Sequence, residues 1–211
     1  MDESQEIQAV KKFISELFNK VKNNPHTDNN AITIGKLSPA GAKYLSDISG
    51  IRIKTATRFT ISENYLRHLY NNHYGDNEKD KGQNVPLTDD DVVALIDVIS
   101  TPNDIVFMGY NRKEQANEFS FVRTNNNGTY SLLEVYSNSD GTLKPKTFYN
   151  SKRSIGGQVM NLIKNSQPYT SQTRTRPIDT SKPEILFVVS NKFFKSKGTT
   201  NFSEKQENSQ K

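Results

Sequence analysis

Two of the three histidines in this chain lie five residues apart, in the stretch YLRHLYNNHYGD from Tyr65 to Asp76. On one helix, His68 and His73 would project about 140° apart, because each residue turns a helix by about 100°. Helical metal-binding pairs prefer spacings of three or four residues, which place both rings on one face. The spacing therefore argues against a metal site, and we expect neither a metal ion nor another cofactor.

An acid and base pair fits these histidines better than a metal pair does. Histidine titrates near neutral pH and is the commonest general acid or base in enzymes. His73 comes just before Gly75, so we expect it at the C-terminal end of a helix, where its ring can point into a cleft. The alternative is that His68 is a partly buried helix residue and His73 faces solvent, and this stretch alone favours that alternative.

A second group of reactive side chains occupies the segment KPKTFYNSKR, residues 144–153, at the end of a predicted strand. Alternation along the strand would place Lys146 and Phe148 on one face, and Thr147 and Tyr149 on the other. Metal-free phosphodiester cleavage needs a base for the attacking hydroxyl, an acid for the leaving oxygen and cations for the phosphorane. Two histidines and this strand end could supply all three, although an ordinary strand with a basic end has the same composition.

The charge of the chain is modestly positive, at +5 with a pI of about 9.2. Seven cations and no acid lie between Lys144 and Arg176, a pattern that could follow the phosphates of a nucleic acid. Composition alone favours a solvated basic surface that is balanced by acids elsewhere. The candidate nucleic-acid contacts are Arg112, Lys113, Arg123, Lys152 and Arg153.

The elements that must position these residues can be predicted from periodicity and from capping and turn residues. The expected helices are residues 4–22, 38–50, 62–75, 88–101 and, more briefly, 154–165. The expected strands are residues 31–35, 51–61, 104–110, 118–124, 130–136 and 143–149, with 184–189 as a further strand or a buried apolar segment. The pairs Asn127-Gly128 and Asp140-Gly141 predict hairpin turns. The polar run from Gly75 to Asn84 is expected to be a flexible loop.

Helices followed by a meander indicate an α+β fold with a four- to five-stranded antiparallel sheet. We expect an N-terminal helix and loop over residues 1–30, one domain over 31–190, and a polar, disordered tail over 191–211. The absence of cysteine excludes disulfides, thiolate zinc sites and a cysteine nucleophile. The sequence shows neither a signal-peptide pattern nor a long apolar stretch, so we expect a cytoplasmic protein without a membrane partner.

The order of these segments resembles the phage-associated nuclease-toxin domains of the barnase–EndoU–colicin–RelE superfamily. The resemblance covers residues 31–153 and is carried by ITIGKLSPAGAKYLSDISGI, FTISENYLRHLYNNHYGD, VPLTDDDVVALIDVISTPNDIVFMG and LKPKTFYNSK. Those domains place a short strand and helix before a helix with a histidine pair. An acidic-capped helix follows, and a strand with a Thr or Ser beside Lys or aromatic residues closes the domain.

The resemblance implies a metal-independent endoribonuclease, in which a 2′-hydroxyl attacks its own phosphate and leaves a 2′,3′-cyclic phosphate. The helix histidines of the family fall on His68 and His73, and the hydroxyl of its closing strand falls on Thr147, with Tyr149 adjacent. The cations that could serve are Lys146, Lys152 and Arg123. The implied partners are RNA and, for a toxin or delivered effector, an immunity or antitoxin protein.

Two other functions stay open at this point. A non-catalytic RNA- or DNA-binding module on the same fold would use the basic residues between 144 and 176 without needing the histidines. A protein-interaction domain would match its basic surface to an acidic partner.

Overall fold

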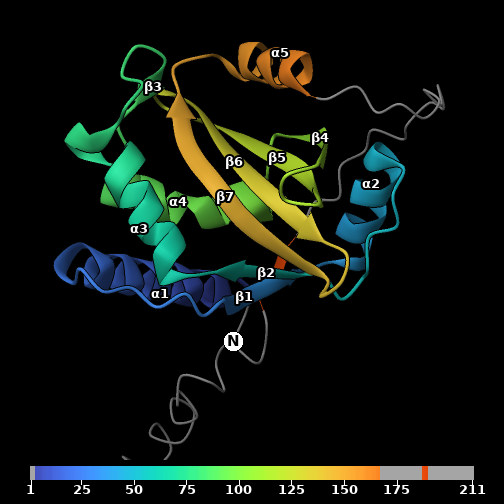
Figure 1. The fold of residues 1–211 in the computed structure, drawn as a ribbon, viewed down its shortest axis with the longest axis horizontal. Helices are drawn as coiled ribbons and strands as arrows, with labels where there is room; N and C mark the ends of the chain where they lie inside the picture. The colour runs from blue at the N-terminus through green and yellow to red at the C-terminus, as the bar shows by residue number, and fades with distance from the viewer. Residues whose placement is uncertain (1–2, 167–186, 190–211) are drawn as a thin grey trace, which may run out of the picture.

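The computed structural model describes residues 3–166 and 187–189 (Figure 1). The helices are α1 (Glu3–Asn23), α2 (Pro39–Ser49), α3 (Glu63–His73), α4 (Asp89–Ser100) and α5 (Ile155–Asn165), with a 3-10 turn, η1 (Gly75–Asn77). The strands are β1 (Ile32–Leu37), β2 (Arg58–Ile61), β3 (Asn84–Val85), β4 (Asp104–Asn111), β5 (Ala116–Asn125), β6 (Gly128–Ser137), β7 (Thr142–Ser151) and β8 (Phe187–Val189). The predicted tail at 191–211 lies outside the described residues.

The α+β class and the central meander are confirmed, because β4, β5, β6 and β7 pair antiparallel in chain order. The sheet is larger than the expected four to five strands. Among the described residues its order is β4-β5-β6-β7-β2-β1-β8, and the short β3 also pairs with β7. Strand β2 runs parallel to β7, and this pairing joins residues more than 80 positions apart in the chain. Local sequence patterns carry no signal for such a pairing.

The expected strand over residues 51–61 was wrong in its first part, since only Arg58–Ile61 forms a strand. The backbone N–H groups of the preceding residues form their hydrogen bonds with side chains and within a turn instead. The N–H of Ile53 donates to Ser46 Oγ at 2.9 Å, and the N–H of Lys54 donates to the Tyr136 hydroxyl at 3.2 Å. Ile53 is buried beneath this turn and is only 5% exposed. Its burial explains why an apolar residue stands here among polar ones without forming a strand.

Three helices are capped by the first residues of the predicted ranges 38–50, 62–75 and 88–101. Ser38 Oγ accepts from the Gly41 N–H at 2.9 Å and opens α2, and Ser62 Oγ accepts from the Tyr65 N–H at 3.2 Å and opens α3. Thr88 and Asp91 form a reciprocal capping box at the start of α4. These caps fix where α3 begins, and its length then places His73 as its last residue.

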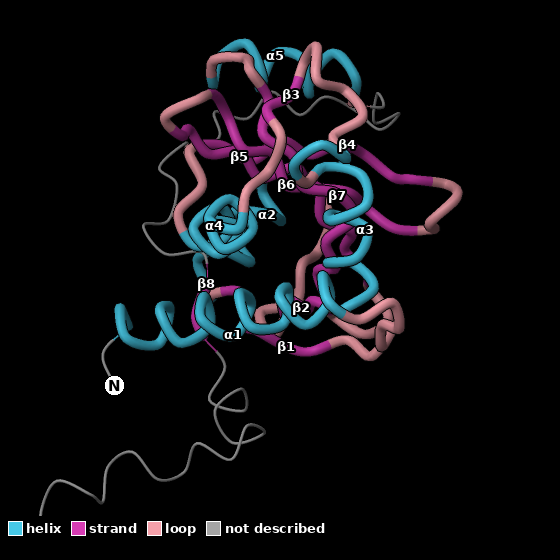
Figure 2. The backbone as a smooth tube through the Cα atoms, turned by 90° about the vertical axis from the view of Figure 1, so that its left-hand side faces the viewer, coloured by secondary structure: helices cyan, strands magenta, loops and turns pink. Residues whose placement is uncertain are grey.

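The sheet has a fully buried face and a second face that is only partly covered. Phe119, Phe121 and Phe148 lie on the first face, where α4 and α1 complete the hydrophobic core. Figure 2 shows α1 passing below α4 and α3. On the second face, Leu162 of α5 packs against Val106 and Val122. Helix α3 packs beside β7, so the uncovered part of the second face lies next to both α3 and α5 (Figure 1).

A β-bulge in β7 changes the direction of one candidate side chain. Leu133 of β6 pairs with Thr147, but the next residue, Glu134, pairs with Pro145, so Lys146 is the extra residue. The expectation that Lys146 shares the face of Phe148 is therefore wrong. Phe148 is fully buried, whereas Lys146 reaches Glu118 on the partly covered face.

Candidate active site

The junction of α3 with β7 brings together side chains that are far apart in the sequence. His73 Nε2 lies 3.2 Å from Thr147 Oγ1, across 74 residues of chain. The rings of His73 and Tyr149 have centroids 6.5 Å apart. Thr147 and Tyr149 lie two residues apart on β7 and so point to the same side. The structure thus gathers His73, Thr147 and Tyr149, all of which were candidates from the sequence.

The second nitrogen of His73 contacts a residue that the sequence analysis missed. Nδ1 lies 3.1 Å from Glu78 Oε2, and the Glu78 side chain is only 1% exposed. The other carboxylate oxygen accepts from the Asp80 N–H at 2.7 Å and from Asn84 Nδ2 at 3.4 Å. The charged run after Gly75 was expected to be a flexible loop, yet it folds back and buries this carboxylate. A single acid within a polar run offers no local signal of burial.

The contacts of Glu78 determine which nitrogen of His73 carries the proton. A carboxylate can only accept hydrogen bonds, so the Nδ1–H of His73 donates to it. Nε2 then carries a lone pair, which can accept a hydrogen bond from the Thr147 hydroxyl. A neutral imidazole that is oriented by a buried carboxylate and presents Nε2 to a hydroxyl has the geometry of a general base.

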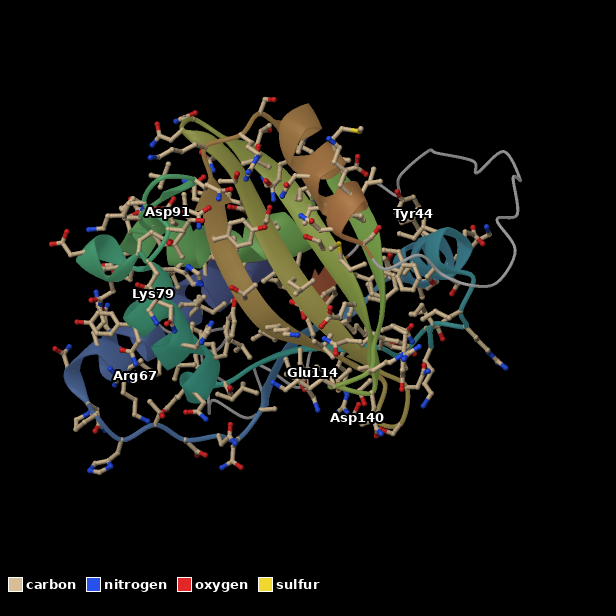
Figure 3. All side chains as sticks on the ribbon, turned by 45° about the horizontal axis from the view of Figure 1, so that its top comes forward. Tyr44, Arg67, Lys79, Asp91, Glu114 and Asp140 are labelled. Atoms are coloured by element: carbon tan, nitrogen blue, oxygen red, sulfur yellow. The ribbon has the colours of Figure 1, made fainter. Side chains whose placement is uncertain are left out.

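His68 lies close to His73 despite the five-residue spacing. The two rings have centroids 5.9 Å apart, and His73 is the last residue of the helix. Asn72 Nδ2 lies 3.1 Å from His68 Nδ1, and Lys79 Nζ donates to Asn72 Oδ1. Figure 3 shows Lys79 beside α3. Desolvation lowers the pKa of His68 below its ordinary value of 6.5, and the charges of His73 and Lys79 lower it further.

The hydroxyl of Tyr149 is held by α5, through a residue to which the sequence analysis gave no role. Gln158 Nε2 donates to the Tyr149 hydroxyl at 3.0 Å and to Ser131 Oγ at 2.8 Å. Gln158 has no exposed surface. The sequence predicted the helix over 154–165, but nothing in it distinguishes Gln158 from an ordinary helix residue.

The candidate cations divide into two groups according to their contacts. Lys152 Nζ donates to the Lys81 carbonyl at 2.5 Å, and Arg153 donates to Gln83 Oε1 at 2.5 Å, so both lie against the loop that carries Glu78. Lys146 shares the face of Thr147 but forms ion pairs with Glu118 at 2.8 Å and Glu114 at 3.8 Å.

The remaining candidate cations lie elsewhere. Arg123 donates to the carbonyl and the hydroxyl of Thr101, at the end of α4. Arg112 and Lys113 are exposed in the turn between β4 and β5. No contact within the described part of the chain joins these three residues to His73 or Thr147.

The site consists of imidazoles, hydroxyls, cations and the single carboxylate of Glu78. Across residues 3–166 and 187–189, no group of three or more His, Cys, Asp or Glu side chains could hold a metal ion. No helix within the same ranges combines the length and apolar character needed to cross a membrane.

Comparison with known proteins shows that a family model matches the part of the chain that holds most of this site. A family model described as phage-Barnase-EndoU-ColicinE5/D-RelE like nuclease3 matches residues 40–156, which is more than half of the chain. The matched range includes His68, His73, Glu78, Thr147 and Tyr149 but ends before Gln158. Searches of curated proteins and of solved structures gave no match.

Proposed function

Because the chain belongs to the phage-Barnase-EndoU-ColicinE5/D-RelE like nuclease family, we propose that it is an endoribonuclease that needs no metal ion. In this reaction the 2′-hydroxyl of one nucleotide attacks the adjacent phosphorus, and the 5′-oxygen of the next nucleotide leaves. The products are a 2′,3′-cyclic phosphate and a free 5′-hydroxyl. The contact of His73 with both Glu78 and Thr147 carries this proposal.

His73 acts as the general base. Its Nε2 has a free lone pair that accepts the proton of the 2′-hydroxyl as the new P–O bond forms. The imidazolium that results is stabilised by Glu78, whose buried carboxylate lies 3.1 Å from Nδ1. Because Glu78 also accepts from a backbone N–H, its position is fixed before the substrate binds. Such positioned proton transfer contributes about 10²–10⁴-fold to a rate.

The phosphorane charge is stabilised by the side chains around His73. The hydroxyl of Thr147 rotates from His73 to a non-bridging phosphate oxygen once the 2′-hydroxyl takes its place at Nε2. Tyr149, on the same side of β7, supplies a second hydroxyl. Lys146 lies on the same face and adds positive charge, part of which Glu118 neutralises. Donors that are held ready for a developing oxyanion are usually the largest catalytic contribution.

His68 protonates the leaving 5′-oxygen in its cationic form. Its ring centroid lies 5.9 Å from that of His73, so a phosphate that lies against the two rings can reach both of them. Since the pKa of His68 is lowered, the rate begins to decline at a lower pH than it would with an ordinary histidine as the acid.

The test uses the full chain with a structured RNA in the presence of EDTA. Wild-type protein should cleave the RNA and leave 2′,3′-cyclic phosphate ends, detected by mass spectrometry. His73→Ala should lower the rate about 10²–10⁴-fold. His26→Ala is the matched control, because His26 is exposed in the loop after α1 and should keep the wild-type rate. A 2′-deoxy nucleotide at the cleavage position should block the reaction.

The opposing outcomes are distinct. Cleavage that requires a divalent metal, or that survives in both His68→Ala and His73→Ala, contradicts the proposal. Salt-sensitive RNA binding without cleavage would instead indicate a binding module. Absence of RNA binding at low salt would indicate a protein-interaction domain.

A further inference from the structure

Helix α5 places one fully buried amide beside the candidate active site. Gln158 has no exposed surface, although it lies on a helix that covers only part of the sheet face (Figure 1). Its Nε2 makes both of its hydrogen bonds to hydroxyls, those of Tyr149 and Ser131. Its Oε1 is buried without a partner among the described residues.

The two ends of this amide are unequally satisfied, and the inequality fixes its orientation. In the orientation that the structure shows, two N–H groups donate and one oxygen is unpaired. In the flipped orientation the oxygen would accept from two hydroxyls, and two buried N–H groups would be unpaired. A buried unpaired polar group costs stability, so the orientation with one such group is favoured. Gln158 therefore acts as a donor toward Tyr149.

The direction of this bond determines what the Tyr149 hydroxyl can do. A phenol has one proton and also accepts hydrogen bonds. When Gln158 donates to its oxygen, the Tyr149 proton cannot point at Gln158 and is free for another acceptor. Tyr149 shares a side of β7 with Thr147, and its ring lies 6.5 Å from that of His73. On that side, the Tyr149 proton can point toward the place where the reacting phosphate would lie.

We propose that Gln158 is a positioning residue that directs the Tyr149 hydroxyl to donate its proton to a non-bridging oxygen of the reacting phosphate. The inference rests on the proposed nuclease function and extends it to a residue beyond the matched family range of 40–156. Gln158 does not touch the substrate. It acts by donating to the Tyr149 oxygen, so that it does not itself accept the Tyr149 proton.

The decisive variant is Gln158→Glu, which has almost the same shape but reverses the bond. In its ionised form the carboxylate can only accept, so it takes from Tyr149 the proton that the phosphate needs. Loss of one oxyanion donor lowers kcat about 10²–10³-fold, and we expect this loss in Tyr149→Phe and in Gln158→Glu. KM should change little, because the missing bond forms mainly in the transition state. In the Tyr149→Phe background, Gln158→Glu should cause no further loss.

Ser131→Ala is the matched control. It removes the other partner of the Gln158 amide, leaves the bond to Tyr149 in place, and should keep kcat within about threefold of wild type. This limit is small beside the loss of about 10²-fold or more that follows removal of an oxyanion donor. Thermal melts of all variants separate unfolding from loss of the donor. Gln158→Asn, which keeps an amide on a shorter side chain, should retain more activity than Gln158→Glu.

The failures of the two proposals can be distinguished. If wild-type protein does not cleave RNA, the nuclease function is overturned and this inference with it. If wild type cleaves but a folded Gln158→Glu has the wild-type kcat, only the role of Gln158 is overturned. The same holds if the losses from Gln158→Glu and Tyr149→Phe multiply in the double variant, because Gln158 would then act independently of Tyr149. If Tyr149→Phe has the wild-type kcat, the roles of both Tyr149 and Gln158 are overturned, and the nuclease function stands.

Discussion

His73 is held at both ring nitrogens by residues of different elements. Glu78 follows η1 and Thr147 lies on β7, so the ring is fixed by the loop on one side and by the sheet on the other. A ring that is held in this way loses little freedom when substrate binds. Each of its two contacts can be changed separately, which allows the role of His73 to be tested without removing the histidine.

Glu78→Gln should abolish base catalysis while leaving the fold in place. The new side-chain oxygen would keep the bonds from Asp80 N–H and Asn84, so the new amide would face Nδ1 of His73. Nδ1 must then accept, and the proton moves to Nε2, where a base needs its lone pair. We expect kcat to fall about 10²–10⁴-fold, measured by initial rates of RNA cleavage. Wild-type rates in this variant would contradict the role of Glu78.

Lys79→Met should move the alkaline limb of the pH–rate profile to higher pH. The charge of Lys79 is one of the causes that lower the pKa of His68, so its removal raises that pKa. A general acid works only while it is protonated, and the rate therefore declines as pH rises through the pKa of His68. Lys81→Met is the control, because the Lys81 side chain pairs with Asp76 at 3.3 Å. A limb that does not move, or that moves equally in both variants, contradicts the assignment of His68.

At the scale of elements, the bulge in β7 separates a buried acid from the side chains of the candidate site. Glu134 of β6 pairs with Pro145 just before the bulge and is 2% exposed. Desolvation raises the pKa of Glu134 well above its ordinary value, and one of its oxygens lacks a partner among the described residues. Desolvation also raises the pKa of the buried Tyr65, and the nearby Glu134 raises it further. This pair lies in the core and has no part in the proposed reaction.

Glu134→Gln should stabilise the protein increasingly as pH rises. The unfolded carboxyl ionises near pH 4.3, whereas the folded one stays protonated to much higher pH. Wild-type stability therefore falls between these two pKa values, by about 1.4 kcal/mol per pH unit, and the glutamine variant lacks this slope. Urea denaturation at several pH values gives both free energies of unfolding. A difference between the proteins that does not depend on pH would contradict this assignment.

The elements with local signals were predicted well. Ser38, Ser62 and Thr88 cap helices because a short side-chain oxygen followed by an apolar-periodic run is a local pattern. The meander strands follow from alternation and from the turns between them. The turn before Arg58 and the parallel pairing of β2 with β7 were missed, because both depend on partners that are distant in the chain.

The residues of the candidate site divide in the same way, into those with a local signal and those that depend on distant partners. His73, Thr147 and Tyr149 have side chains that suggest chemistry by type, and the structure brings them together. Glu78 and Gln158 matter because of burial and hydrogen bonding that no local pattern encodes. The cation Lys146 was assigned to the wrong face, since a bulge shifts alternation by one residue and strand periodicity alone does not reveal it.

At the scale of the whole molecule, α1 lies outside the matched family range but completes the core. Val10, Ile14, Phe18 and Val21 are each at most 2% exposed. Full burial of such a side chain contributes about 1.5–3 kcal/mol, and four of them together are comparable to the whole stability of a typical domain. The chain therefore depends on this helix although the family match begins after it.

Removal of residues 1–24 should abolish cooperative folding. Loss of α1 exposes the apolar surfaces of α3 and α4 that it covers (Figure 2). We expect loss of the thermal transition followed by circular dichroism, and with it loss of RNA cleavage. Lys12→Ala, on the exposed side of α1, is the control and should shift stability by less than about 0.5 kcal/mol. A cooperative transition in the truncated protein would contradict the role of α1.

The 74 residues between His73 and Thr147 also matter while the chain is being made. Among the residues of the candidate site, a ribosome releases His73 and Glu78 first, then Thr147 and Tyr149, and Gln158 last. The base therefore has no hydroxyl partner until β7 emerges, pairs with β2 and packs against α3. Under the proposed RNA cleavage, the site would therefore be incomplete for as long as β7 is still unmade on the ribosome.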